Sequence, residues 1–255
     1  MPEQTSSIVR DICIALITTG ITGIFSQVYF RLLKWRQLRH LGHLRTKDGI
    51  IKIVIPTILK ASFPKDHFSE NAIIPDNIPL MPMPEGRALA NLVSGISDAI
   101  RGVDIKFVTH NDFVDDGVTP FVSIGGPSVN EVSREILNQM VPGFRIQYPD
   151  HIGYFGSRKM SPRVEKGILL EDFGFLFQGK SRLGTRCIVV CGVWATGTEL
   201  ACVTYAGSVQ NDSVSKVRRL LFRQSELFVV LKATVQNYQI GEPKLDAYSE
   251  NPSRL

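Results

Sequence analysis

Residues 187–203, CIVVCGVWATGTELACV, have the pattern of a strand followed directly by a helix, and this pattern predicts the fold class. Its first half is an apolar, β-branched run that ends at Gly192, which is typical of a strand buried on both faces of a sheet. A short turn leads to a helix that we expect over 197–207. A strand, a glycine turn and a helix in direct succession are the building unit of an α/β domain.

A second segment, FVSIGGPSVNEVSREIL at 121–137, repeats the same order. Its strand ends at Gly125 and Gly126, and a helix is expected over 129–140. Open parallel sheets bind ligands in the crevice outside the carboxyl ends of their strands, and both junctions fall at such ends. We therefore expect the two glycine turns to face one crevice.

Each junction also has a structural explanation that needs no ligand. Ser128 stands three residues before Glu131, and Thr196 stands three residues before Glu199. Both pairs have the spacing of a capping box, in which a hydroxyl and a carboxylate bind free amides of the first helical turn. Tight turns followed by capped helices would account for the two motifs.

Along the rest of the chain, segments with the apolar pattern of a strand alternate with segments that have helical spacing. Apolar runs predict strands over 49–56, 103–110, 120–126, 144–148, 172–180, 185–194 and 227–238. Helical spacing predicts helices over 85–100, 129–140, 197–207 and 213–224. The order predicts a three-layer, Rossmann-like α/β domain over 48–240 with a mostly parallel sheet. We interpret 149–167 as a surface loop, 241–255 as a polar tail, and the long connection 57–84 as a segment that is either functional or mobile, and that would be a lid if the protein is an enzyme.

Before this domain stands the longest apolar stretch of the chain, residues 12–30. Its length is close to the roughly 20 residues that cross a bilayer, so it predicts one transmembrane helix. The flank 31–47 is basic and has the leucine spacing of an amphipathic juxtamembrane helix. The positive-inside rule then puts 1–11 outside and the α/β domain on the cytoplasmic side of an inner or plasma membrane.

Two alternatives to a transmembrane helix are weaker. A cleaved signal peptide has its basic residues before the apolar core, and here the order is reversed. An interfacial helix would show a polar face, which 12–30 lacks but 31–47 has. We expect the basic flank to contact anionic lipid and Gly20 and Gly23 to offer a small-residue face for homo-oligomers.

Charge and cysteine content limit the function classes. The net charge is +5, and without the six basic residues of 31–47 it becomes −1, so the basicity does not predict a nucleic-acid site. The cysteines have no metal-site or disulfide spacing, so we expect buried thiols in a strand and a helix. The five histidines are scattered, and we expect no metal site. The four cysteines are Cys13, Cys187, Cys191 and Cys202.

The two junctions supply the predicted ligand-binding residues. They are Gly125, Gly126, Pro127 and Asn130 at the first, and Gly192, Gly197, Thr198 and Glu199 at the second. Glycine turns let amides approach a ligand, and a helix N-terminus favours an anionic group. Neither turn is a GxGxxG fingerprint or a P-loop, so no standard dinucleotide or ATP site is predicted, and the cofactor stays undefined.

These segments resemble an uncharacterised group of bacterial Rossmann-like α/β proteins. Its motifs are GGP-x-x-N, an acidic-aromatic-Gly strand, and G-x-x-x-x-G-T-x-x-A. They match here at Gly125, Gly126, Pro127 and Asn130, at Asp172, Phe173 and Gly174, and at Gly192, Gly197, Thr198 and Ala201, with MP-x-x-E at Met83, Pro84 and Glu85 a further match. The Gly-Thr-Glu turn is also similar, at different spacing, to LOG and DprA-like nucleotide-binding proteins. The resemblance implies fold and site location, and no activity.

Three functions follow as hypotheses. The first is a membrane-anchored sensor or effector whose domain binds a nucleotide or related small anion. The second is a hydrolase or transferase acting at a nucleotide N-glycosidic or phosphate bond, with Glu85 and Asp172 as the candidate catalytic carboxylates. The third is an interaction module without a ligand. We favour the first, because the sequence contains no complete catalytic motif. Whether the chain is an enzyme is left open.

Overall fold

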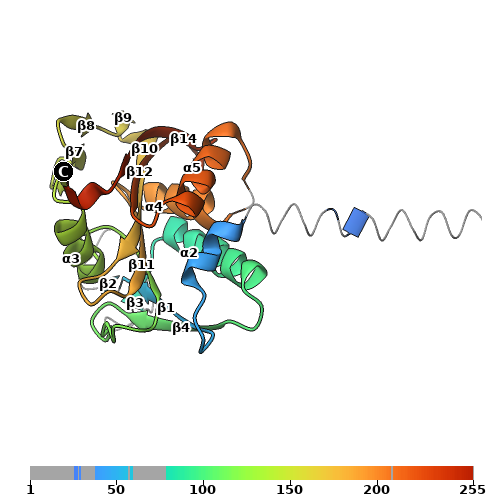
Figure 1. The fold of residues 1–255 in the computed structure, drawn as a ribbon. Helices are drawn as coiled ribbons and strands as arrows, with labels where there is room; N and C mark the ends of the chain where they lie inside the picture. Colours follow the sequence, from blue (N-terminus) through green and yellow to red (C-terminus); the bar gives the residue numbers. More distant parts are fainter. Residues whose placement is uncertain are drawn as a thin grey trace, which may run out of the picture. The chain divides into compact units, whose positions relative to one another are not determined.

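The computed structural model describes residues 38–56, 58–59, 79–207 and 209–254, together with Ser26, Gln27 and Tyr29. The chain divides into two units, Met1–Arg39 and His40–Leu255. The second unit contains all the described strands and the helices α2 to α5 (Figure 1). The α/β character expected from the alternation of strands and helices is therefore confirmed.

A large sheet forms the centre of this unit. Its strand order is β13-β12-β10-β11-β5-β1-β4, with β14 paired to β12 and β9 paired to β10 (Figure 1). The strands are β1 (Ile50–Ile55), β4 (Asp104–Thr109), β5 (Phe121–Ile124), β9 (Arg163–Glu165), β10 (Ile168–Lys180), β11 (Arg186–Gly192), β12 (Leu227–Gln236), β13 (Gln239–Ile240) and β14 (Lys244–Glu250).

The sheet is mixed, so the predicted mostly parallel, Rossmann-like class is wrong. β4, β1, β5 and β11 run parallel to one another, but β10 is antiparallel to both β11 and β12, and β14 is antiparallel to β12. The turn between β10 and β11, residues 181–185, decides this. Neighbouring parallel strands need a crossover of a dozen or more residues, so two strands joined by five residues must be antiparallel.

Helices cover both faces of the sheet. α3 (Glu131–Met140) packs on one face beside β5 and β11, and a three-stranded meander of β6 (Phe144–Gln147), β7 (Ile152–Phe155) and β8 (Arg158–Met160) lies next to it. α4 (Ala195–Ala206) packs on the other face, against β10, β11 and β12, and α2 (Met83–Ala99) packs on α4 (Figure 1). α5 (Asp212–Arg223) contacts α4, β12 and β14. A β2 (Ile58–Leu59) and β3 (Pro79–Leu80) pair and the 3-10 helices η1 (Arg39–Leu44) and η4 (Pro252–Arg254) complete the described elements.

Helix α4 lies very close to the sheet because glycines remove side chains from the contact. A Cβ at Gly197 would lie 2.1 Å from the carbonyl oxygen of Phe173, and a Cβ at Gly174 would lie 2.5 Å from the carbonyl oxygen of Gly197. Every residue of α4 from Thr196 to Ala206 is buried. The G-x-x-x-x-G-T-x-x-A pattern thus has a packing role here, which is the close approach of a helix to a strand.

The opposite face of the sheet holds an aromatic core. Phe173, Phe175 and Phe177 alternate along β10 and meet Phe228 of β12 and Phe144 of β6. Three cysteines are free and buried, as predicted from their apolar context: Cys187, Cys191 and Cys202. Cys13 lies outside the described residues.

Two stretches interpreted as irregular contain strands. The predicted surface loop 149–167 holds β7, β8 and β9, and the predicted polar tail 241–255 holds β14, which extends the main sheet beside β12. β8 and β9 read RKM and RVE, and most of their residues are exposed. Short strands that face water on both sides lack the apolar alternation that marks a strand in a sequence.

The predicted single-pass membrane protein, with its C-terminal domain cytoplasmic, is contradicted. Among the residues that the structure describes, no helix is both long and apolar enough to cross a membrane. Among the described helices the most apolar is α4, whose 12 residues span about 18 Å against a hydrocarbon core of about 30 Å. The stretch 12–30, the face at Gly20 and Gly23, and the segment 1–11 lie outside the described residues, apart from Ser26, Gln27 and Tyr29.

The described end of the basic flank belongs to the domain core. Leu41 and Leu44 are fully buried, and the Nε2 atom of His40 lies 2.6 Å from the carbonyl oxygen of Tyr205. The leucine spacing that predicted a lipid-facing amphipathic helix over 31–47 is, from His40 onward, the spacing of side chains that enter a protein core. Residues 31–37 lie outside the described part.

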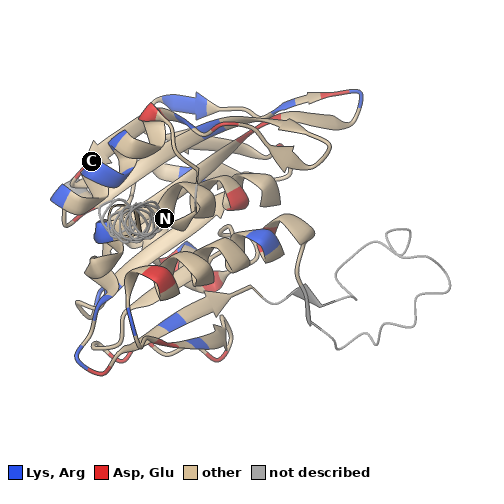
Figure 2. Cartoon of the chain, turned by 90° about the vertical axis from the view of Figure 1, so that its right-hand side faces the viewer, with Lys and Arg blue, Asp and Glu red and all other residues tan. Residues whose placement is uncertain are grey.

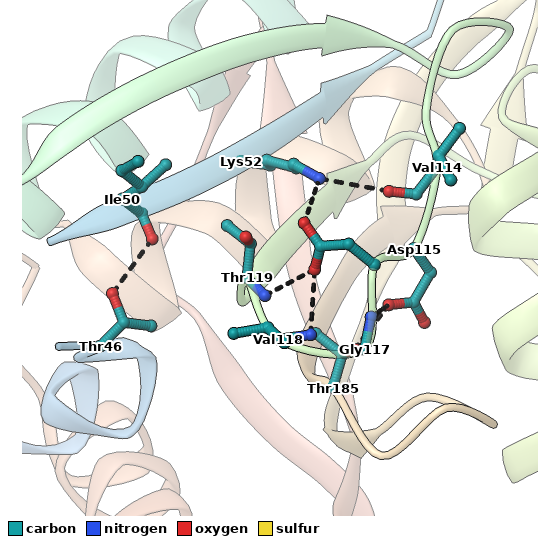
Figure 3. Close-up of polar contacts among 10 residues, drawn as sticks. Thr46, Ile50, Lys52, Val114, Asp115, Gly117, Val118, Thr119 and Thr185 are labelled. Carbon is teal, nitrogen blue, oxygen red and sulfur yellow. Dashed lines mark hydrogen bonds and ion pairs between the residues drawn. The ribbon is translucent and has the colours of Figure 1, made fainter. Parts of the chain in front are cut away.

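Polar contacts hold the loop between β4 and β5 (Figure 3). The Asp116 carboxylate accepts from the Lys52 ammonium at 2.8 Å and from the amides of Val118 and Thr119 at 2.9 and 2.7 Å. The Asp115 carboxylate accepts from the Thr185 hydroxyl at 2.5 Å. The hydrogen bond from Lys52 holds the pKa of Asp116 well below its usual range. Figure 2 shows both basic and acidic residues on the helices and the strands of this side of the domain.

Candidate functional site

The two glycine turns lie side by side at the carboxyl edge of the parallel strands. β5 and β11 are parallel neighbours, with Ile124 opposite Val190. The amide of Gly125 donates to the carbonyl of Val190 at 3.0 Å, and a Cβ at Gly126 would lie 3.3 Å from the carbonyl oxygen of Gly192. This adjacency is what the predicted common site requires.

Gly126 packs against neighbouring parts of the protein itself. A Cβ at Gly126 would lie 3.7 Å from the Tyr148 hydroxyl as well as close to Gly192. Gly125 has a φ of +97°, a left-handed conformation that glycine adopts without strain. The glycines at 125, 126 and 192 therefore have conformational and packing roles, and their contact with a ligand stays a prediction.

The first predicted capping box is wrong, because the chain caps α3 with a different residue. Asn130 is the N-cap: its Oδ1 accepts from the Ser133 amide at 3.2 Å, and its Nδ2 donates to the Ile124 carbonyl at 2.7 Å. Glu131 instead pairs with Arg134. Asn130 is 1% exposed, so its amide holds the strand end to the helix start and does not face solvent.

The second predicted capping box is also wrong, since a residue from β10 caps α4. The Oδ2 atom of Asp172 accepts from the Thr196 hydroxyl at 2.5 Å and from the Gly197 amide at 2.6 Å, and Oδ1 accepts from the Phe173 amide at 2.8 Å. Burial raises the pKa of Asp172 to about 6, against these hydrogen bonds, which lower it. A fixed carboxylate thus occupies the anion position at the start of α4.

Glu199, the other half of that predicted box, forms an ion pair with α2. Its two carboxylate oxygens accept from Nε and Nη2 of Arg87 at 2.7 and 2.6 Å. The same Nη2 donates to the carbonyl of Tyr238 at 2.6 Å. Glu199 therefore holds Arg87, and Arg87 holds the turn between β12 and β13.

Glu85 is the most unusual of the predicted carboxylates. It lies in the first turn of α2, is 4% exposed, and its Oε2 atom has no hydrogen-bond partner in the described part of the chain. Burial raises its pKa to about 7. An unpaired carboxylate inside a protein favours its neutral form, because the charged form loses its hydration.

A cavity of about 540 Å³ opens beside these groups, where α4 begins. Four segments line it: the start of α2, the hairpin of β9 and β10, the start of α4, and the turn between β12 and β13. The lining residues are Pro84, Val164, Gly167, Ile168, Leu169, Trp194, Ala195, Thr196, Val235, Asn237 and Tyr238. None of the predicted ligand-binding residues lines it, and neither do Glu85 and Asp172, although Thr196 is bonded to Asp172. We call it the Trp194–Tyr238 cavity.

Tyr238 is held at this cavity in a strained conformation. Asn237 and Tyr238 form a two-residue hairpin turn, with Gln236 paired to Gln239, and both have positive φ, 50° and 59°. Such turns strongly favour glycine at the second position, and a bulky residue there is a genuine outlier. The Tyr238 ring is 72% exposed, so packing does not explain its presence.

Trp194 connects the cavity to the glycine turns. It is 40% exposed and is the residue immediately before α4. The His151 ring stacks on it with centroids 3.9 Å apart, and the Tyr148 ring meets His151 edge-on at 5.3 Å. These aromatic residues were absent from the predicted site. Trp194 lies inside the quoted 187–203 stretch and was the one detectable signal, whereas Tyr148, His151 and Tyr238 come from segments with no motif.

The described His, Cys, Asp and Glu side chains do not form a metal-binding group. Within the described residues no group of three or more His, Cys, Asp or Glu side chains could hold a metal ion.

The chain matches no protein-family model, and no curated protein matches it.

Proposed function

We propose that this domain binds a small molecule with a planar ring, a nucleotide or a related compound, in the Trp194–Tyr238 cavity. The observation that carries the proposal is Tyr238, a strained residue whose exposed ring lines a cavity at the carboxyl edge of the sheet. Backbone strain of this kind costs on the order of 1–3 kcal/mol and concentrates where a ligand is held. A glycine would relieve the strain and remove the ring.

The cavity has the size and lining that such a ligand needs. A volume of about 540 Å³ lies within the roughly 300–1,000 Å³ of small-molecule sites, and the lining is mostly apolar with a few polar groups. Thr196 and Asn237 supply those polar groups. Trp194 and Tyr238 supply aromatic rings, on which a planar ligand stacks with about 1–3 kcal/mol per ring.

The catalytic alternative has less support. Asp172 accepts three hydrogen bonds that hold α4 to β10, which is a structural role. Glu85 is buried and does not line the cavity. Ligand binding in the cavity, without catalysis by these two carboxylates, is the simpler account.

A protein-interaction surface is the second candidate, favoured by the rim of the same cavity. Val164 and Ile168 line it with 50% and 63% of their surface exposed, and Met83, next to the lining residue Pro84, is 64% exposed. Exposed apolar side chains that gather in one place mark binding surfaces.

Tryptophan fluorescence tests the proposal. The chain has two tryptophans, so Trp35→Phe leaves Trp194 as the single reporter. Titration with adenosine monophosphate and related nucleotides should change its emission with saturation. Tyr238→Ala should abolish the change, and Tyr248→Ala, at a tyrosine of β14 that is 42% exposed and absent from the cavity lining, should not. Equal binding by the Tyr238 and Tyr248 variants would refute the assignment to this cavity.

A further inference from the structure

We infer that the Trp194–Tyr238 cavity admits the uncharged base of a nucleoside, leaves the phosphate outside, and selects a base that carries an amino group through Thr196. This inference rests on the proposed function and adds the class of ligand. It also replaces the anion expected at the glycine turns by a neutral ring.

The first argument is the charge of the lining. The eleven lining residues within the described part of the chain include no Lys, Arg, His, Asp or Glu. A phosphate that entered would lose its hydration without gaining a cation from these residues, which is strongly unfavourable, and Arg87, which donates to the Tyr238 carbonyl, is already paired with Glu199. The Asp172 carboxylate, bonded to the lining residue Thr196, would also repel it. A neutral planar ring meets none of these costs and gains contact with Trp194 and Tyr238.

The second argument is the polarity of the Thr196 hydroxyl. When Asp172 is ionised its carboxylate has no proton to donate, so the Thr196 hydroxyl must give its proton to that carboxylate. A hydroxyl has one proton and two lone pairs. With the proton committed to Asp172, Thr196 offers a ligand only lone pairs and therefore accepts a hydrogen bond.

This polarity separates bases of the same shape. Adenine and cytosine carry an exocyclic amino group, which donates, whereas hypoxanthine and uracil carry a carbonyl oxygen at the corresponding position. A carbonyl would bring two acceptors together without a proton between them. We expect adenosine to bind at least tenfold more tightly than inosine, and adenosine and adenosine monophosphate to bind within threefold of each other.

The test uses the full chain with Trp35→Phe at pH 8, where Asp172, with a pKa of about 6, is ionised. Adenosine, inosine, adenosine monophosphate and inosine monophosphate are titrated against Trp194 fluorescence. Thr196→Ser keeps the hydroxyl and should keep the preference for adenosine. Thr196→Val removes the acceptor and should bring the ratio near one, with the melting temperature recorded to show that the variant is folded.

The outcomes separate the inference from the function beneath it. Equal affinity for adenosine and inosine in the parent chain overturns base selection while ligand binding stands. Binding of the monophosphates without binding of the nucleosides overturns the entry of the base, and again leaves ligand binding intact. No binding of any of the four compounds at millimolar concentration overturns both. If Thr196→Val does not fold, the parent chain and Thr196→Ser still decide, because loss of the preference in the serine variant contradicts the role of the hydroxyl.

Discussion

Replacing Glu85 by Gln should change how the stability of the domain depends on pH. Glu85 is 4% exposed, its Oε2 atom has no hydrogen-bond partner within the described residues, and burial raises its pKa from 4.5 to about 7. Between these two values the folded protein holds a proton that the unfolded chain has released. The contribution of Glu85 to the free energy of unfolding therefore falls as the pH rises from about 4.5 to about 7, and is constant above that range.

The magnitude follows from the difference between the two pKa values. The shift is about 2.5 pH units, and each unit corresponds to about 1.4 kcal/mol, so the full effect is about 3 kcal/mol. Glutamine cannot ionise, so the variant should lack this loss. The comparison between two pH values matters more than either stability alone, because the buried glutamine amide also has hydrogen bonds to satisfy.

Urea unfolding at pH 5 and pH 8 measures the effect on the wild type, on Glu85→Gln and on Glu135→Gln, a control at an exposed glutamate of α3. Asp172 also has a raised pKa, but it is present in all three proteins and cancels in the comparison. Between pH 5 and pH 8 the wild type and the control should lose about 2.5 kcal/mol more than Glu85→Gln, because part of the full effect already falls below pH 5. If all three lose the same amount, Glu85 is not the buried, unpaired acid that the structure shows.

Three other changes test the fold and the cavity. In α2, Gly86→Ala should stabilise the domain by about 0.5–1 kcal/mol, since nothing lies within 4 Å of its Cβ position. Gly95→Ala should destabilise it by about 2 kcal/mol or more, because its Cβ would lie 2.2 Å from the Ala206 carbonyl oxygen. Thermal melts of the two variants check this order of stability. Because Tyr238 has a φ of 59°, Tyr238→Gly should be about 1 kcal/mol more stable than Tyr238→Ala, the reverse of the usual order. Chemical unfolding of both variants measures this difference. If the two variants are equally stable, or if the alanine variant is the more stable, the turn is not strained. Arg218→Met should lower stability by about 2–3 kcal/mol, since the 7% exposed guanidinium donates to the carbonyls of Val203, Thr204 and Gly207 at the end of α4; an unchanged urea midpoint would show that these bonds are dispensable.

The local pattern of the sequence determined where the main elements lie. The strand predicted over 185–194 is β11 at Arg186–Gly192, and the helix predicted over 85–100 is α2 at Met83–Ala99. These elements are long and their apolar residues recur with one period, so neighbours along the chain suffice to recognise them. The same pattern placed both glycine turns at strand ends, and β5 and β11 are neighbours in the sheet.

The partners of the helix ends were decided only in three dimensions. The α4 cap, Asp172, is 24 residues from Thr196, and Arg87 is 112 residues from Glu199. A capping box is read from a spacing of three residues, so it cannot reveal a carboxylate that arrives from another strand. At α4 the local pair was replaced by a buried carboxylate of β10, which accepts from the Thr196 hydroxyl and the Gly197 amide of the first turn.

The candidate site depends most on tertiary structure. Pro84, Ile168, Trp194 and Tyr238 come from four segments, and no spacing in the sequence relates them. Tyr238 stands out only through its positive φ and its exposed ring, which are properties of the folded turn. A sequence records periodicity because a helix or strand repeats it along the chain, but a cavity is enclosed by surfaces that folding brings together, so its shape, its charge and the polarity of Thr196 exist only in the folded protein.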